Sequence, residues 1–167
     1  MNKTNYITFF INDYKNSETM LTESIKSLMQ GKYNDHHVYL QNFSKFEGVF
    51  LLKIIANLDG KVKFLIRDNN LIKISVTFDI KNEDKISKCI IHFQDSLLLL
   101  PSSLAKLAIN FGVESKGSFD FSKLNLAKTP QQLNQIRHEL LDYNKKDCLI
   151  LDASIISSNV QICTGNI

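Results

Sequence analysis

The spacing of apolar residues changes in the middle of this chain. Over residues 20–29 and 133–150, apolar side chains recur every three or four positions, which is typical of amphipathic helices. Between these segments, β-branched and aromatic residues fill three runs, at residues 62–66, 71–78 and 87–93, with short polar links. Three such runs predict an antiparallel meander of strands, so the chain must combine a sheet with helices.

The sequence before the meander predicts two strand–helix pairs. Residues 6–11 are aromatic and β-branched and favour an opening strand, and residues 38–40 favour a short buried strand. Asn16 is a typical cap for the helix that follows the first strand, and apolar spacing predicts a second helix near residues 46–57. The order favours a mixed α/β or α+β layer fold, built as a single domain of residues 1–167.

After the meander, Ser102 and Ser103 can cap a helix that Gly112 ends. Residues 114–128 lack periodicity and predict a loop, whose lysines could contact a DNA backbone. Pro130 then opens a long helical stretch, and the tail from residue 157 is expected to fray.

Composition limits the classes of function. The net charge of +3 permits nucleic-acid binding without arguing for it. No apolar run approaches the roughly 18 residues of a membrane span, which predicts a soluble domain with no membrane partner. The three cysteines form no C-x-x-C pair, and the start of the chain resembles neither a signal nor a transit peptide. Abundant Lys, Asn and Ile indicate an AT-rich coding sequence.

Two short motifs could carry chemistry. A segment from Asn42 to Glu47 follows the predicted strand at residues 38–40, and Tyr143 precedes Asp147 by one helical turn. Carboxylates from separate elements can converge on two divalent cations that activate water and stabilise a leaving oxygen. By contrast, His36 and His37 are adjacent on a predicted strand and point to opposite faces, and His92 has no partner at ligand spacing.

In this order, the motifs resemble those of the 3′–5′ proofreading exonuclease of family B DNA polymerases, in particular the protein-primed type of linear mitochondrial plasmids and bacteriophages. The family's second motif, Asn-x-x-(x)-Phe-Asp-Gly, resembles the segment from Asn42 to Gly48, and its third, Tyr-x-x-x-Asp, resembles Tyr143 and Asp147. A Ser-Leu segment between them resembles Ser96-Leu97. The resemblance runs over about residues 6–156 and implies a ribonuclease H-like exonuclease fold.

The resemblance implies a catalytic role for three residues. Asp147 and Glu47 would bind Mg²⁺ or Mn²⁺, and Tyr143 would orient the attacking water. Glu47 stands where the family has Asp, which moves the carboxylate by about 1 Å.

It also implies a partner, the single-stranded 3′ end of DNA. Asn42 and Phe46 would hold that end, the ring by stacking, while Ser96 and Leu97 would pack against the terminal nucleotides.

The family's first motif, Asp-x-Glu, has no counterpart before Asn42, and the polymerase motifs are also absent. We therefore expect a fold incomplete at its N-terminal strand and a chain inactive on its own, with the remainder of a split polymerase as a possible partner. An open edge beside residues 6–11 would then favour aggregation. By resemblance, the location is mitochondrial and organelle-encoded. The alternatives are a non-catalytic single-strand-binding fragment or a relic reading frame.

Overall fold

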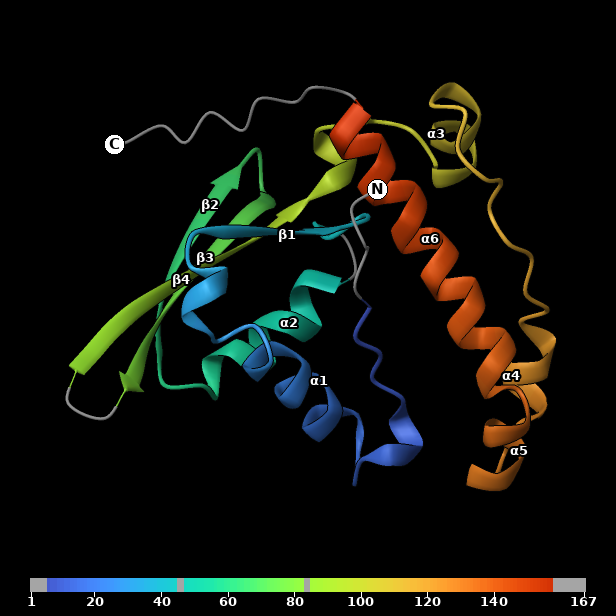
Figure 1. Ribbon diagram of the computed structural model, residues 1–167, viewed down its shortest axis with the longest axis horizontal. Coiled ribbons are helices and arrows are strands. Elements are labelled where there is room, and N and C mark those ends of the chain that lie inside the picture. The colour runs from blue at the N-terminus through green and yellow to red at the C-terminus, as the bar shows by residue number, and fades with distance from the viewer. Residues whose placement is uncertain (1–5, 45–46, 83–84, 158–167) are drawn as a thin grey trace. The chain divides into compact units, whose positions relative to one another are not determined.

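The computed structural model describes residues 6–44, 47–82 and 85–157 (Figure 1). The chain divides into two compact units, one of residues Asp13–Leu99 and one of the described parts of Met1–Asn12 and Leu100–Ile167. Each unit has its own buried cluster, so each is described by itself.

The sheet of the first unit has four strands in the order β1-β4-β3-β2. Its strands are β1 (His36–Leu40), β2 (Gly60–Arg67), β3 (Asn70–Asn82) and β4 (Lys85–Asp95). The last three form the predicted antiparallel meander, and β1 pairs with β4 in parallel, with Leu40 opposite Asp95. The sheet is therefore mixed, and β1 and β2 are its two edges.

The turn between β2 and β3 follows from its two central residues. Asp68 and Asn69 have positive φ angles of 49° and 60°. Two-residue hairpin turns with this backbone fit the twist of antiparallel strands, and Asn and Asp tolerate the conformation.

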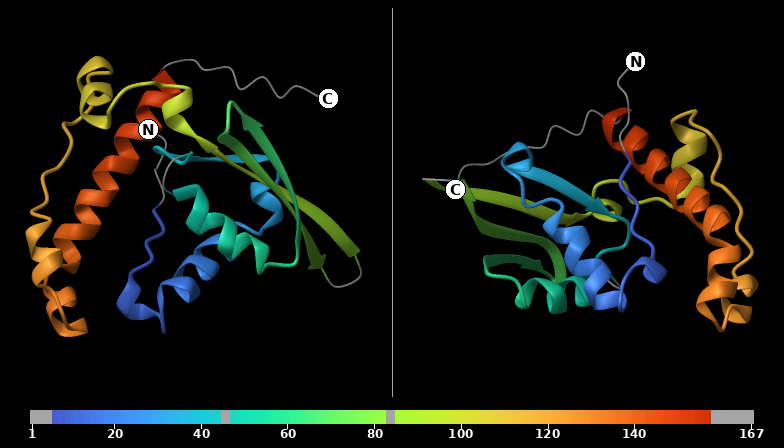
Figure 2. Two further views of the ribbon diagram at one scale, coloured as in Figure 1. Left: turned by 180° about the vertical axis from the view of Figure 1, so that it is seen from behind. Right: turned by 60° about the horizontal axis from the view of Figure 1, so that its bottom comes forward.

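Helices α1 (Ser17–Lys26) and α2 (Glu47–Ala56) lie on the same face of the sheet (Figure 2). The predicted cap is confirmed, since the Asn16 side chain accepts a hydrogen bond from the Thr19 amide at 2.8 Å. Apolar residues of both helices and of the strands form one core, whose buried members are Ile25, Phe43, Ile54, Ile55, Ile74, Val76, Phe78, Cys89, Ile91 and Phe93. Short 3₁₀ turns η1 (Ile11–Asp13), η2 (Gly31–Tyr33) and η3 (Ser96–Leu98) connect the longer elements.

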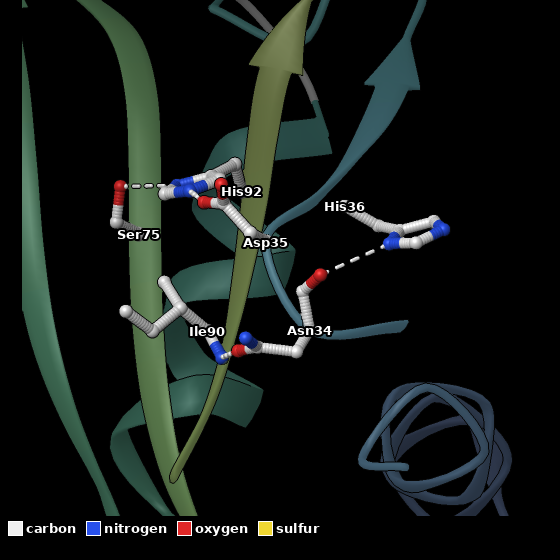
Figure 3. A network of polar contacts seen from close by, with 6 residues as sticks. All are labelled: Asn34, Asp35, His36, Ser75, Ile90 and His92. Carbon is white, nitrogen blue, oxygen red and sulfur yellow. Dashed lines mark hydrogen bonds and ion pairs between the residues drawn. The ribbon is translucent and has the colours of Figure 1, made fainter. Parts of the chain in front are cut away.

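A polar network fixes the start of β1 on β4 (Figure 3). The Asn34 side chain accepts from the Ile90 amide at 2.8 Å, and the Asp35 amide donates to the Ile90 carbonyl at 2.7 Å. The Asp35 carboxylate contacts His92 Nε2 at 2.8 Å, while His92 Nδ1 lies 2.8 Å from Ser75 Oγ on β3. Three segments are thereby joined at one end of the parallel pair.

The second unit is built on α6 (Arg137–Ser157), against which α3 (Leu104–Asn110) packs through Leu107, Ala108 and Ile150 (Figure 1). Two short helices complete it, α4 (Ser122–Leu126) and α5 (Pro130–Gln135). None of the described helices is both long and apolar enough to cross a membrane.

The predicted ends of α3 are confirmed. Ser103 caps its first turn, and Gly112 follows it with a φ of +62°. The helical stretch predicted from Pro130 is instead two helices, because the backbone leaves the helical region at Ile136. A capping box between Thr129 and Gln132 starts the first of them.

The loop predicted at residues 114–128 contains a helix, α4. The Asp120 carboxylate accepts a hydrogen bond from the Ser122 amide at 3.0 Å and so supports its first turn, which hydrophobic periodicity does not reveal. The tail predicted to fray begins at Ser157, which is still the last residue of α6, and its remainder, residues 158–167, lies outside the described residues.

The opening strand predicted at residues 6–11 is wrong. Residues 6–10 have no regular secondary structure and belong to the α6 unit instead of the sheet. Asn12 Nδ2 donates to the Pro130 carbonyl at 2.7 Å and to Asn134 Oδ1 at 3.0 Å, and the Phe10 ring lies 4.6 Å from the Arg137 guanidinium. These side-chain contacts hold the segment against α5 and α6, so the open edges of the sheet are those of β1 and β2.

His37 should make the stability of the chain pH-dependent. Its ring centroid lies 4.8 Å from that of His92, and burial lowers its pKa below the ordinary 6.5, with Lys73 and His92 adding to the effect and Gln94 and Asp35 opposing it. The unfolded chain therefore binds more protons as the pH falls from 6.5 through the lowered pKa. We expect the free energy of unfolding to decrease over this window and His37→Gln to flatten the decrease, as measured by urea unfolding at several pH values.

His36→Gln is the matched control for this measurement. His36 is exposed on the same strand, where its ring lies 3.1 Å from the Asn34 carbonyl and meets the Tyr33 ring edge-on at 5.7 Å between centroids. Its replacement should leave the pH slope intact, and an unchanged slope in His37→Gln would contradict the assignment.

Candidate functional site

Tyr143 and Asp147 lie one turn apart on α6, as their spacing predicts. The Asp147 side chain is 22% exposed, and its Oδ2 lies 3.6 Å from the ammonium of Lys116. The other oxygen, Oδ1, is buried and has no hydrogen-bond partner within the described part of the chain. A buried carboxylate oxygen without a partner is costly unless something else satisfies it, so this atom marks a position for a ligand.

Lys116 is the residue that sequence reasoning missed. Its ammonium lies 5.4 Å from the centroid of the Tyr143 ring as well as beside Asp147. A hydrogen bond with the Tyr143 side chain is the largest cause that raises the pKa of Lys116; burial opposes it, and the Asp147 charge adds to it. The lysine is therefore cationic at neutral pH and joins the phenol to the carboxylate.

The segment around Lys116 runs close along α6. A Cβ on Gly117 would lie 3.1 Å from Lys146 Cδ and 3.7 Å from Tyr143 Cδ2, so a residue without a side chain allows this approach. Further along, Phe121 meets the Tyr143 ring edge-on, at 5.6 Å between centroids and 89° between planes, and Phe119 lies 6.0 Å away. These aromatic contacts hold the Tyr143 ring in place.

In the sheet unit, the buried carboxylate of Asp95 joins two of the predicted motifs. Its Oδ2 accepts from the Ser44 amide at 2.8 Å and from the Ser44 hydroxyl at 2.6 Å, and its Oδ1 accepts from the Leu97 amide at 2.8 Å. Asp95 is only 3% exposed, so these bonds replace its lost hydration. The turn after β1 and the turn after β4 are thereby held together.

Asn42, Ser96 and Leu97 lie at this end of the sheet, where β1 and β4 both finish. Asn42 adopts a φ of +61°, which asparagine tolerates. The Ser96 hydroxyl is fully buried and lies 2.7 Å from Gln41 Oε1 and 3.2 Å from the Leu40 carbonyl. Ser96 therefore connects β1 to β4, a structural role that is separate from its predicted contact with DNA.

The remaining predicted site residues are Phe46 and Glu47. Phe46 lies outside the described residues. Glu47 begins α2, but its side chain is not among those described. Glu47 belongs to the sheet unit and Asp147 to the α6 unit. Across residues 6–44, 47–82 and 85–157, no three His, Cys, Asp or Glu side chains gather closely enough to hold a metal ion.

The fold resembles that of a known polymerase. Phi29 DNA polymerase complexed with single-stranded DNA matches 81% of this chain with a TM-score of 0.55 and 21% identity, over 24% of its own length. The same polymerase in a post-translocation complex with primer-template DNA matches 83% with a TM-score of 0.57 and 20% identity, again over 24% of its length. The chain thus has a ribonuclease H-like fold, which it shares with part of this polymerase.

Sequence comparison gives the family. The model of DNA polymerase type B, organellar and viral, matches residues 27–162, and the chain belongs to this family. It is 38% identical over 102 residues to a probable DNA polymerase of Neurospora intermedia, covering 61% of this chain and 10% of that protein. A probable DNA polymerase of Ascobolus immersus is 35% identical over 114 residues, covering 68% and 9%. The chain therefore spans about a tenth of the length of these curated relatives.

Asp95→Ala should destabilise the sheet unit strongly. The substitution removes three hydrogen bonds to a buried carboxylate and leaves the Ser44 and Leu97 amides unsatisfied, for an expected loss of about 2–4 kcal/mol in the free energy of unfolding. Urea unfolding measures the loss. Asp79→Ala, at an exposed position on β3, should change it by less than about 0.5 kcal/mol, and equal losses in both variants would contradict the role of Asp95.

Proposed function

We propose that this chain forms the 3′–5′ exonuclease region of a protein-primed family B DNA polymerase. Its reaction would be the hydrolysis of the terminal phosphodiester of a single-stranded 3′ end, assisted by Mg²⁺ or Mn²⁺. The observation that carries the proposal is the α6 cluster of Lys116, Tyr143 and Asp147, in which one buried Asp147 oxygen has no hydrogen-bond partner among the described residues.

Each side chain of the cluster has a distinct part in this chemistry. The Lys116 ammonium, whose pKa is raised by Tyr143 and Asp147, presents positive charge to a phosphate whose oxygens gain negative charge in the transition state. The Tyr143 phenol can orient the attacking water through a hydrogen bond. Its ring is fixed by Phe119 and Phe121, so this orientation is set before the substrate binds.

Asp147 fits the donor set of a hard divalent cation, since carboxylate oxygens are the ligands that Mg²⁺ and Mn²⁺ prefer and its Oδ1 has no described partner. Asp147 would contribute a ligand to the ion. When bound, the ion would supply an activated water and charge stabilisation for the leaving oxygen.

The sequence provides no Asp-x-Glu before Asn42, so further carboxylates would have to join the site. The outer edge of β1 is free of pairing in the described sheet, and β1 leads directly to the turn at Asn42. A strand paired along this edge, in cis or from the remainder of a split polymerase, would add carboxylates close to that turn.

The end of the sheet unit would bind the DNA strand. Asn42, Ser96 and Leu97 gather there, and Phe46 and Glu47 follow Asn42 in sequence. Support comes from phi29 DNA polymerase, which has this fold and has been captured with single-stranded DNA. Since the two polymerase relatives named above are fungal proteins, we further propose a mitochondrial, plasmid-type origin with a role in DNA replication.

A second candidate is a single-strand-binding fragment without catalysis. Asp95 organises the Asn42 end of the sheet independently of Asp147, so binding there does not require a complete metal site. A relic reading frame would show neither cleavage nor binding of single-stranded DNA.

Cleavage tests the enzymatic proposal. A 3′-labelled single-stranded oligonucleotide with Mg²⁺ or Mn²⁺ should be degraded once an Asp-x-Glu strand is supplied, in cis or as a separate peptide. Asp147→Asn should lower the rate about 100-fold or more and Lys116→Met about 10- to 100-fold. Asp142→Asn is the control, because Asp142 lies on the same helix and pairs with exposed His138 at 3.2 Å. A folded, reconstituted chain that cleaves nothing would count against the proposal.

A DNA-binding measurement distinguishes the single-strand-binding fragment from the relic reading frame. We expect the chain to bind a short single-stranded oligonucleotide weakly in fluorescence anisotropy, with affinity that falls as salt rises. Phe46→Ala should remove most of the binding, since stacking on an aromatic ring contributes about 1–3 kcal/mol per base. Binding without cleavage after reconstitution favours the binding fragment, and no binding at low salt favours the relic.

A further inference from the structure

The face of the sheet away from α1 and α2 carries mostly polar side chains. Ile74, Val76 and Phe78 of β3 are completely buried in the core beneath the helices. Side chains alternate along a strand, so Ser75 and Thr77 between them lie on the opposite face. The strand register extends this polar face over β2, β3 and β4, where it consists of Lys61, Lys63, Leu65, Arg67, Lys73, Ser75, Thr77, Asp79, Lys81, Lys88, Ile90, His92 and Gln94.

Positive charge is concentrated on this polar face. Six of its residues are lysine or arginine, whereas Asp79 is its one acidic residue among the described positions of the three strands. The whole chain has a net charge of only +3, so the excess on this face is larger than that of the entire chain. A one-sided distribution of this kind attracts a polyanion more effectively than the net charge indicates.

The lysines of the polar face lie close together without neutralising partners. Lys61 and Lys63 are both exposed and lie two residues apart on β2, about 7 Å along the strand. Lys73 follows on the adjacent strand, and no ion pair between described residues involves any of these three. A phosphate bound between them would offset their mutual repulsion.

A hollow on the same face offers a place for such a phosphate. Its volume is about 410 Å³, and its lining includes Lys61, Lys88 and the Thr77 side chain, whose hydroxyl can donate to an anion. Asp79 also lines the hollow, opposite Lys88 in the register, and weakens the attraction there.

The polar face is suited to a nucleic-acid backbone and not to bases. Among its described residues His92 supplies the one aromatic ring, and this side chain is 13% exposed and held between Asp35 and Ser75. Bases therefore find no ring on which to stack, as single-strand binding requires. Duplex DNA instead presents phosphates at high density, one for about every 1.7 Å of helix axis.

We propose that the polar face of the sheet binds the phosphate backbone of duplex DNA, independently of base sequence. The inference extends the proposed function, because it adds a second DNA contact to the single-strand site at the Asn42 end.

Fluorescence anisotropy of the chain with a short labelled duplex tests this contact. The duplex is closed at both ends by short loops and the buffer contains EDTA, so the probe has no 3′ end and is not cleaved. At low salt we expect a dissociation constant of about 1–100 µM that rises steeply with salt. Lys61→Gln combined with Lys63→Gln should raise it about tenfold and reduce the slope of log affinity against log salt by about 2, and Lys73→Gln alone by about 1.

Two further variants control for fold and for charge. Lys53→Gln removes the same charge from exposed Lys53 on α2, on the helix side of the sheet, and should leave duplex binding nearly unchanged. Asp79→Asn removes the acidic residue of the polar face and should tighten binding several-fold. All variants should unfold in urea like the parent. Absence of duplex binding at low salt, or equal weakening by Lys53→Gln and by the Lys61 and Lys63 substitutions, would overturn the proposal.

Phe46→Ala distinguishes this surface from the single-strand site and should leave duplex binding unchanged. A chain that binds single strands through Phe46 but does not bind the duplex would overturn the duplex contact alone. A chain that binds the duplex through its lysines but cleaves nothing after reconstitution would count against the exonuclease alone.

Discussion

The buried carboxylate of Asp95 is the interaction on which the organisation of the sheet unit depends. A charge removed from water must be satisfied by hydrogen bonds, and Asp95 takes them from Ser44 on one turn and Leu97 on another. The turn after β1 therefore cannot be positioned without the turn after β4. Two motifs that lie about fifty residues apart in the sequence become one structural end, from which α2 and Glu47 begin.

Local signals predicted much of this fold correctly. The meander, the cap at Asn16 and the glycine after α3 depend on neighbouring residues, so periodicity and turn chemistry were sufficient. Residues 6–11 have the composition of a strand, yet contacts from Asn12 and Phe10 to residues more than a hundred positions away hold them against helices. The sequence carries no local signal for such contacts.

The same difference between local sequence signals and long-range contacts applies to the candidate site. Tyr143 and Asp147 were predictable because four residues make one helical turn. Lys116 comes from an aperiodic segment about thirty residues earlier, and only the close approach at Gly117 brings it to them. His37 and His92 were treated as unrelated, although the parallel pairing of β1 with β4 places them directly opposite each other.

Both ends of β1 are pinned to β4, at its start through Asn34 and Asp35 and at its finish through Asp95 and Ser96. A strand fixed at both ends has a fixed number of residues, because each added residue lengthens it by about 3.3 Å and reverses the facing of every side chain beyond it. Insertions and deletions within this strand should therefore be strongly disfavoured. We expect differences in length between related chains to fall in the segments outside these two attachments.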